Sequence, residues 1–341
     1  MTLRFGLVGL GYHGKAAVIP SFYKNEAVGV EMTAVCDVNP DAVAAIDRPV
    51  EKYTSVDEML AKAPIDAVYV AVGMEYHCQV AVAALKAGKH VICEKPMAQT
   101  LEQCRLMVDT AKANGRLLAI NFETRYSQKI QLIKRWINEG RFGRIEAIHF
   151  DNLWDGHKSF GPVAERRARL LAVAGGLDCG VHELDQARFF LGGNWKMVHA
   201  VGAWFGESFN PPPHIGIIGL FDNGPMFTLN ASLGFASQIE PRPMVSSVIV
   251  AGNEGVAVVR TELLAHHCVA ELSSRTLCEK VEFSTVGHAS DIALLLAEFA
   301  KVVASGPDTP HLFATGEDGY QAQYAMELAN REAQENRVQI Q

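Results

Sequence analysis

The sequence predicts an α/β fold in which a doubly wound parallel sheet is followed by an α+β domain built on a large, mostly antiparallel sheet. A chain of 341 residues is longer than one hydrophobic core usually supports, so two domains are expected. Apolar runs alternate with helix-like segments up to about residue 122, whereas later apolar runs follow one another with turns between them. We therefore predict one domain over residues 1–122 and a second over residues 123–341.

The first domain is predicted from short apolar runs that alternate with helical patterns. Parallel strands that helices cover on both faces are apolar along their whole length, and right-handed strand–helix–strand units connect them. This order predicts a nucleotide-binding sheet. The apolar runs lie at 3–8, 30–36, 67–72, 90–93 and 117–121, and helices are expected at 15–25, 40–47, 77–87 and 100–113.

The second domain is predicted from strands joined by turn signals such as Asp222-Asn223-Gly224. Its segments are a helix at 128–139 and strands at 144–150, 214–221, 226–233 and 247–252. One broad face of such a sheet has to be covered, and the sequence shows too few helices to do so. This indicates a homo-oligomer, a homodimer or homotetramer, formed through the sheet.

Composition limits the partners and the compartment. The formal net charge of −7 gives no general attraction for nucleic acid or anionic lipid. No apolar run approaches the roughly 20 residues that span a bilayer, and the N-terminal segment lacks a signal-peptide layout. Seven scattered cysteines without Cys-x-x-Cys spacing suit a reducing compartment. We therefore expect a cytoplasmic protein with a small-molecule partner, and neither disulfides nor a metal site.

A glycine-rich turn follows the first strand and reads Gly9-Leu10-Gly11-Tyr12-His13-Gly14. In the dinucleotide fingerprint the first glycine permits a tight turn, the second lets the backbone approach a pyrophosphate, and the third lets helix pack on strand. The alternative is an ordinary glycine-rich turn in a strand–helix unit. We predict that the cofactor contacts Gly9, Gly11, Tyr12, His13 and Gly14.

An aspartate ends the second apolar strand. Asp37 stands 23 residues after Gly14, close to the spacing of about 20 in the fingerprint. Its carboxylate can accept hydrogen bonds from the ribose hydroxyls and would repel a 2′-phosphate, which favours NAD over NADP. Alternatively, this aspartate only opens the turn that ends at Pro40.

A lysine follows the fourth parallel strand in the motif Glu94-Lys95-Pro96, at the carboxyl end of the sheet where such folds bind ligands. The segment AGKHVICEKPMA (87–98), the glycine turn and GGLDCGVH (175–182) together resemble the glucose-fructose oxidoreductase, inositol dehydrogenase and MocA (Gfo/Idh/MocA) family. The Glu94-Lys95-Pro96 motif and GGLDCGVH are about 80 residues apart, and the resemblance extends in order over nearly the whole chain. It implies an N-terminal Rossmann domain and a C-terminal domain with a mixed sheet that binds the substrate.

The resemblance also implies catalytic roles for three residues. Lys95 would bridge nicotinamide and substrate, and Asp178 and His182 would contact the reacting hydroxyl. Oxidising an alcohol requires a base and a cation near the developing alkoxide, and positions 178 and 182 share one face of a helix. We assign His182 as general base, Lys95 as electrostatic stabiliser and Asp178 as hydroxyl ligand or orienter of His182. The alternatives are a surface lysine, a helix N-cap and a solvated helical pair.

Further residues are predicted near the cofactor and the substrate. His77 matches a family position and is expected to shape the nicotinamide-side turn, and Glu94 is expected in the cofactor site. The family usually has a small polar pair such as Thr-Pro after the third strand, but this chain has Val72-Gly73 there. Aromatic and cationic groups beyond the first sheet can hold a sugar ring or an acidic substituent, although a solvated helix face would contain the same arginines. These substrate candidates are Arg125, Trp154, His157, Arg166 and Arg169.

The predicted function is that of an NAD-dependent dehydrogenase that transfers hydride between nicotinamide and a hydroxyl of a sugar, sugar acid or cyclitol. One alternative is an NAD-dependent glycoside hydrolase that acts by transient oxidation and elimination. Another is a noncatalytic NAD or sugar sensor, against which the presence of Lys95, Asp178 and His182 argues. The sequence alone does not define the substrate or its stereochemistry.

Overall fold

A computed structural model describes residues 2–153, 177–204, 212–232, 244–263, 265–285 and 287–337. The chain forms two compact units, and neither is a continuous stretch of sequence. The first consists of Met1–Tyr126 with Gly287–Tyr320, and the second of Ser127–Val286 with Gln321–Gln341. These units differ from the predicted division into residues 1–122 and 123–341, because a late segment of the chain belongs to the first unit.

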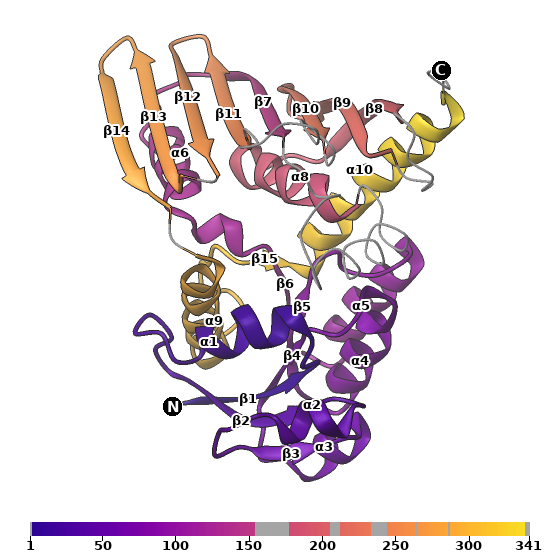
Figure 1. Ribbon diagram of the computed structural model, residues 1–341. Coiled ribbons are helices and arrows are strands. Elements are labelled where there is room, and N and C mark those ends of the chain that lie inside the picture. The colour runs from indigo at the N-terminus through magenta and orange to yellow at the C-terminus, as the bar shows by residue number, and fades with distance from the viewer. Residues whose placement is uncertain are drawn as a thin grey trace. The chain divides into compact units, whose positions relative to one another are not determined.

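The first unit is built on a seven-stranded sheet in the order β15-β6-β5-β4-β1-β2-β3 (Figure 1). All neighbouring strands are parallel except β15, which pairs antiparallel with β6. The parallel, doubly wound sheet confirms the first half of the predicted fold class. The strands are β1 (Leu3–Val8), β2 (Val30–Cys36), β3 (Glu51–Tyr53), β4 (Ala67–Val70), β5 (His90–Glu94), β6 (Leu118–Asn121) and β15 (Ala314–Thr315).

Helices lie on both faces of this sheet (Figure 1). On one face α4 (Met74–Lys86) and α5 (Leu101–Ala113) pack together, while α2 (Pro40–Ala44) and α3 (Val56–Lys62) connect the strands near β3. The helix predicted at 15–25 is shorter and consists of a π-helical turn, Gly14–Val18, followed by α1 (Ile19–Ser21). Pro20 has no amide hydrogen, so it cannot donate a hydrogen bond within a longer helix.

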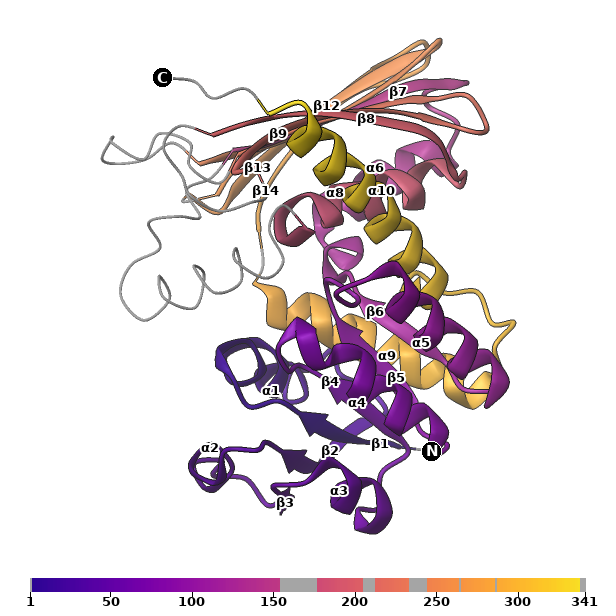
Figure 2. The same cartoon turned by 90° about the vertical axis from the view of Figure 1, so that its right-hand side faces the viewer.

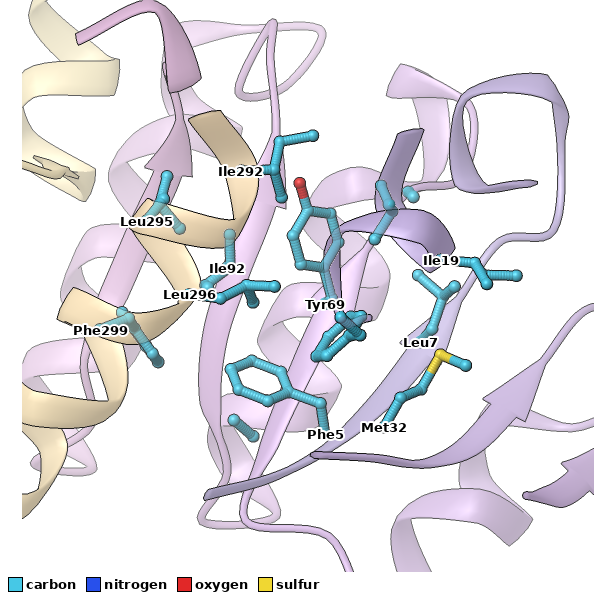
Figure 3. Packing of buried hydrophobic residues seen from close by; sticks show 14 of the residues in the cluster. Phe5, Leu7, Ile19, Met32, Tyr69, Ile92, Ile292, Leu295, Leu296 and Phe299 are labelled. Atoms are coloured by element: carbon cyan, nitrogen blue, oxygen red, sulfur yellow. The ribbon is translucent and has the colours of Figure 1, made fainter. Parts of the chain in front are cut away.

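The long helix α9 (His288–Ser305) packs on the first unit. Its apolar side chains, including Leu295 and Phe299, face Phe5, Tyr69 and Ile92 of the sheet, as Figure 3 shows. All five side chains are fully buried. Burial of this apolar surface explains why a segment distant in sequence joins the first unit.

The second unit is built on an eight-stranded sheet in the order β14-β13-β12-β11-β7-β10-β9-β8. Neighbouring strands are antiparallel, except that β10 and β7 are parallel. This confirms the prediction of a large, mostly antiparallel sheet. The strands are β7 (Ile145–Leu153), β8 (Trp195–Ala203), β9 (His214–Phe221), β10 (Met226–Ser232), β11 (Val245–Gly252), β12 (Gly255–Glu262), β13 (His267–Ser274) and β14 (Cys278–Ser284).

One face of this sheet is covered by helices, as Figure 2 shows. These are α6 (Gln128–Asn138), α8 (Leu177–Leu191) and the part of α10 (Gly316–Glu335) that belongs to this unit. Along β9 and β10 the side chains alternate, so that Ile217 and Leu229 are buried while Ile218 and Met226 are more exposed. The covering helices are more numerous than the sequence indicated, but the opposite face carries exposed apolar side chains.

Two further expectations concern membrane-spanning helices and disulfides. Among the described residues, no helix combines the length and the apolar character that crossing a membrane requires. No disulfide joins the six cysteines whose side chains the structure describes.

We expect Phe299→Ala to lower the free energy of unfolding by about 3–5 kcal/mol, because it leaves a cavity between α9 and the sheet. Leu294→Ala on the same helix is the matched control, since Leu294 is 39% exposed. Its effect should stay within about 1 kcal/mol. Urea denaturation of both variants measures the difference, and equal effects would contradict this packing.

Candidate functional site

The glycine turn after β1 has the packing that the dinucleotide fingerprint requires. Gly9 has a φ of 104°, and a Cβ atom there would lie 2.4 Å from the Ala71 carbonyl oxygen. A Cβ atom on Gly14 would lie 2.3 Å from the Gly9 carbonyl oxygen. A Cβ atom on Gly11 meets nothing within 4 Å, and the neighbouring Tyr12 is 58% exposed. Gly9 and Gly14 are thus required for close packing, while Gly11 leaves the backbone open to a ligand.

Asp37 binds this turn from the end of β2. Its Oδ2 atom accepts a hydrogen bond from the Leu10 amide at 2.7 Å, and its Oδ1 atom accepts one from the Asn39 amide at 2.9 Å. The side chain therefore binds both the glycine turn and the turn toward Pro40. The second contact is the turn role considered from the sequence, while the ribose role stays a prediction. The residue is only half-buried, so its carboxylate lies near the surface at the carboxyl edge of the sheet.

Glu94 at the end of β5 is the centre of a buried polar network. Its side chain is 10% exposed, and its Oε1 atom lies 3.0 Å from His13 Nε2. The same oxygen accepts hydrogen bonds of 2.8 Å from the Tyr69 hydroxyl and from the Asn121 amide. Figure 3 shows the Tyr69 hydroxyl near Ile292 at the edge of the apolar cluster. Glu94 was predicted to belong to the cofactor site, and the structure directs one of its oxygens into this internal network.

The charges in this network stabilise one another. Burial alone would raise the pKa of Glu94, but the His13 charge and the hydrogen bonds hold it below its usual value. The Glu94 charge raises the pKa of His13 against the effect of burial. Burial and the adjacent carboxylate raise the pKa of Tyr69 well above its ordinary range, so its hydroxyl remains a donor. The glycine turn therefore contains a histidine with a raised pKa that faces a buried carboxylate.

His77, in the first turn of α4, joins two backbone segments around Lys95. It is 2% exposed, and its Nδ1 and Nε2 atoms lie 2.9 Å and 3.1 Å from the carbonyl oxygens of Pro96 and Val72. Burial lowers the pKa of His77, although the contacts with the two carbonyl oxygens act in the opposite direction. These contacts tie the end of β4 to Pro96, next to Lys95, and the role of His77 beside the nicotinamide stays a prediction.

A second histidine–carboxylate pair lies at the end of β6. His288 Nδ1 is 2.7 Å from Glu123 Oε1, and the Glu123 side chain is 4% exposed. The hydrogen bond to Glu123 raises the pKa of His288. Sequence reasoning missed this pair because its members are 165 residues apart. Sequence reasoning also missed Tyr69 and Asn121. A polar group within or at the end of an apolar strand could have indicated that these side chains take part in a buried polar network.

The predicted catalytic residues lie on elements of both units. Lys95 directly follows β5 in the first unit and is half-buried. Asp178 and His182 lie on α8 in the second unit, which confirms that they belong to one helix, and His182 is half-buried. The side chain of Asp178 lies outside the described part of the structure. Near His182 on the same helix, Glu183 accepts a hydrogen bond of 3.0 Å from Asn152 on β7.

Of the residues predicted to contact the substrate, the structure describes Arg125. Arg125 is 4% exposed, donates a hydrogen bond of 3.0 Å to the Leu312 carbonyl oxygen, and lies 3.6 Å from the Asp318 carboxylate. It therefore anchors the C-terminal segment of the first unit, and its contact with the substrate stays a prediction. Trp154, His157, Arg166 and Arg169 fall outside the described residues. In the described part of the chain, no three His, Cys, Asp or Glu side chains are arranged to hold a metal ion.

Two segments of the chain match known family domains. Residues 3–122 match the oxidoreductase family with an NAD-binding Rossmann fold, and residues 130–258 match the GFO/IDH/MocA C-terminal domain. The chain belongs to the Gfo/Idh/MocA oxidoreductase family. This confirms the resemblance seen in the motifs and identifies the domain that contains the glycine turn as an NAD-binding Rossmann domain.

Three curated relatives of this Gfo/Idh/MocA protein are named dehydrogenases or reductases. Levoglucosan dehydrogenase from Pseudarthrobacter phenanthrenivorans is 32% identical over 218 residues, which cover 60% of this chain and 55% of that enzyme. Inositol 2-dehydrogenase from Salmonella typhimurium is 31% identical over 203 residues, covering 58% and 57%. The 1,5-anhydro-D-fructose reductase from Ensifer adhaerens is 36% identical over 196 residues, covering 55% and 56%. The chain thus spans little more than half the length of these relatives.

Solved structures share the Gfo/Idh/MocA fold over nearly the full length. A levoglucosan dehydrogenase in complex with NADH and levoglucosan superposes with a TM-score of 0.81 at 22% identity, covering 98% of each chain. The WlbA dehydrogenase from Bordetella pertussis, in complex with NADH and UDP-GlcNAcA, gives a TM-score of 0.77 at 22% identity, covering 99% and 98%. At this level of identity the likeness establishes the fold alone.

We expect the stabilising effect of the His13–Glu94 pair to depend on pH. Because folding raises the pKa of His13 above 6.5, the pair stabilises the fold fully below pH 6.5, and this contribution is lost as pH rises through the raised pKa. The difference in free energy of unfolding between wild type and His13→Gln should therefore shrink as the pH rises above about 6.5. Tyr12→Phe is the control, and a constant difference for His13→Gln would contradict the ion pair.

Proposed function

We propose that this chain is an NAD-dependent dehydrogenase that transfers hydride between nicotinamide and a hydroxyl of a sugar, sugar acid or cyclitol. The observation that carries the proposal is the direct link between the glycine turn and the predicted catalytic lysine. His13 of the turn binds Glu94, and Lys95 is the next residue in the chain. The substrate class is supported by relatives that are named for levoglucosan, inositol and an anhydro sugar.

The residues suit oxidation of a secondary alcohol. His182 accepts the hydroxyl proton, for which an imidazole is well matched near neutral pH. The Lys95 ammonium stabilises the negative charge that develops on the substrate oxygen. Asp178 binds a substrate hydroxyl or orients His182. NAD, when bound, accepts the hydride from the carbon that carries the hydroxyl.

The chain's own residues also suit NAD better than NADP. The open backbone at Gly11 gives a pyrophosphate room to approach, and Asp37 presents a carboxylate at the end of β2. A carboxylate there can accept hydrogen bonds from ribose hydroxyls, but it repels the additional phosphate of NADP. The cytoplasmic location expected from composition stays a prediction.

The exposed face of the second sheet supports the proposal of a homo-oligomer. Its apolar side chains come from several strands, and large exposed apolar patches commonly mark interaction sites. Polar side chains such as His149 and Asn230 lie among them and can form hydrogen bonds across an interface. The exposed apolar residues are Met197, Val201, Ile218, Met226 and Val256.

Activity is tested by absorbance at 340 nm with NAD and a panel of cyclitols, aldoses, sugar acids and aryl glycosides. We expect NADH formation with at least one polyol, and a loss of about 100-fold or more in kcat/KM in both Lys95→Ala and His182→Ala. Lys86→Ala, an exposed lysine at the end of α4, and His267→Ala on β13 are the matched controls.

Two other outcomes would overturn the proposed dehydrogenase. Aglycone release that requires NAD but accumulates no NADH would identify a redox-assisted hydrolase. Cofactor binding without turnover of any compound in the panel would favour a sensor.

Oligomerisation is tested by light scattering. We expect the wild-type chain to form a dimer or tetramer, and Ile218→Asp to shift it toward the monomer because a charge would be buried at the interface. Val38→Asp is the control, since Val38 is 87% exposed in the first unit. A wild-type monomer, or an unchanged oligomer in Ile218→Asp, would argue against association through this face.

A further inference from the structure

A small cleft lies at the amino edge of the first sheet, opposite the edge that carries the glycine turn. Strands β1, β4, β5 and β6 are parallel, so their amino ends meet here and their carboxyl ends meet at the cofactor edge. The last turns of α9 complete its walls. This amino-edge cleft has a volume of about 240 Å³ and belongs to the first unit. Its lining includes Leu3, Ile65, Lys89, His90, Arg116 and Val303.

The position of the proton on the His90 ring follows from its contact with the segment before β6. Nδ1 lies 3.1 Å from the backbone nitrogen of Leu117, whose N–H group can only donate, so Nδ1 accepts and carries no proton. Burial and the Arg116 charge lower the pKa of His90 to about 4, although the Asp66 charge acts in the opposite direction. The ring is therefore neutral near pH 7, and its single proton is on Nε2.

Two hydrogen-bond donors consequently meet in the amino-edge cleft. Arg116 Nη1 lies 3.4 Å from His90 Nε2. A guanidinium group has donors only, and Nε2 carries the ring proton, so these two nitrogens cannot form a hydrogen bond with each other. An oxygen atom that lies beside both nitrogens and accepts a hydrogen bond from each would satisfy the two donors. The geometry is thus that of a site that lacks its acceptor.

The amino-edge cleft also has an excess of positive charge. Lys89 donates one hydrogen bond of 2.8 Å to the Ile65 carbonyl oxygen, and its ammonium group has further N–H donors. The carboxylate of Asp66 is compensated by Arg4, whose guanidinium nitrogens lie 2.9 Å from both of its oxygens. Within the described part of the chain, no carboxylate is close enough to form an ion pair with Lys89 or Arg116. Two cations are therefore available to an anion.

A role in stabilising helix ends does not account for this arrangement. Lys89 and Arg116 lie just beyond the carboxyl ends of α4 and α5, where the helix dipole favours cations. However, Lys86 and Lys112 already occupy the last turns of these helices and do not line the cleft. The backbone amides of Lys89 and Arg116 also donate to carbonyl oxygens near the two helix ends, at 3.0 Å each. The helix dipole explains the charge at this edge, but not the two donors that face each other.

We propose that the amino-edge cleft binds a phosphate group, either free phosphate or the phosphate of a small organic molecule. Arg116 and His90 donate hydrogen bonds to one of its oxygens, and Lys89 adds charge and a further donor. A tetrahedral phosphate presents oxygens in several directions, which suits donors that come from the separate segments before β5 and β6. Apolar side chains such as Ile65 and Val303 leave room for an uncharged part of the ligand. This site is independent of the proposed dehydrogenase activity.

Binding is tested by the rates at which Lys89 is acetylated and Arg116 is modified by phenylglyoxal, measured by peptide mass spectrometry on the full chain. Inorganic phosphate is compared with chloride at the same pH and ionic strength. Both rates should fall as the site fills, by about tenfold once phosphate reaches about ten times its Kd. Lys86 and Lys112 are controls in the same sample, because both are exposed and lie at the same helix ends outside the cleft.

Variants identify the donors that hold the phosphate. Arg116→Gln removes one of the two facing donors and should abolish the protection of Lys89 by phosphate, whereas Arg116→Lys keeps the charge and should restore part of it. Arg116 is exposed, so neither change disturbs the core. Lys112→Gln is the matched control, since it removes the same charge from the same end of α5, and it should leave the protection of Lys89 unchanged.

The outcomes are specific to this site. Equal rates in phosphate and chloride would overturn the proposal, because the two donors would then hold water only. Equal protection of Lys86 and Lys112, or full protection of Lys89 in Arg116→Gln, would overturn it as general screening of charge. Equal protection by acetate would overturn the assignment of phosphate. If glycerol phosphate protects at lower concentration than inorganic phosphate, the ligand is an organic phosphate, and the reverse order identifies free phosphate.

These results are distinguishable from those on the proposed function. Modification needs no turnover, and phosphate bound at the glycine turn would not protect side chains at the opposite edge of the sheet. Protection of Lys89 and Arg116 in a protein that oxidises no compound in the panel would support this site and overturn the dehydrogenase. An active dehydrogenase without protection would do the reverse.

Discussion

The buried carboxylate of Glu94 is the interaction on which the rest of the cofactor-binding edge depends. One of its oxygens binds groups from three other parts of the first unit, namely His13, Tyr69 and Asn121. Ionised carboxylates are rarely buried unless several donors compensate the charge, and here the donors come from the glycine turn and the strands on either side. The cofactor loop is therefore connected by hydrogen bonds to the strand that carries Lys95.

Much of the first unit could be predicted because its signals are local. Continuous apolar runs predicted the parallel strands, and the glycine spacing predicted a turn whose packing tolerates no side chain at Gly9 or Gly14. Asp37 followed from its distance to that turn and binds it directly through the Leu10 amide. Each of these features depends on residues that are near in sequence or belong to one strand–helix unit.

The features that the sequence did not predict depend on contacts between distant segments. The apolar face of α9 shows that the helix has to be buried, but not which sheet covers it. Arg125 has the charge of a substrate ligand, yet its neighbours Leu312 and Asp318 come from the far end of the first unit. The same holds for Glu123 and His288, each of which looks like an ordinary surface residue until the fold brings them together.

The discontinuous first unit has a consequence for synthesis. A ribosome releases residues 1–126 long before it reaches 287–320, although the two segments share one core. During synthesis of the second sheet, the apolar surface around Phe5 and Tyr69 therefore remains uncovered, because α9 has not yet been made. Nascent chains with such surfaces are prone to aggregation and commonly depend on chaperones. This topology makes chain completion, and not the folding of the N-terminal strands, the step that protects the dinucleotide-binding core.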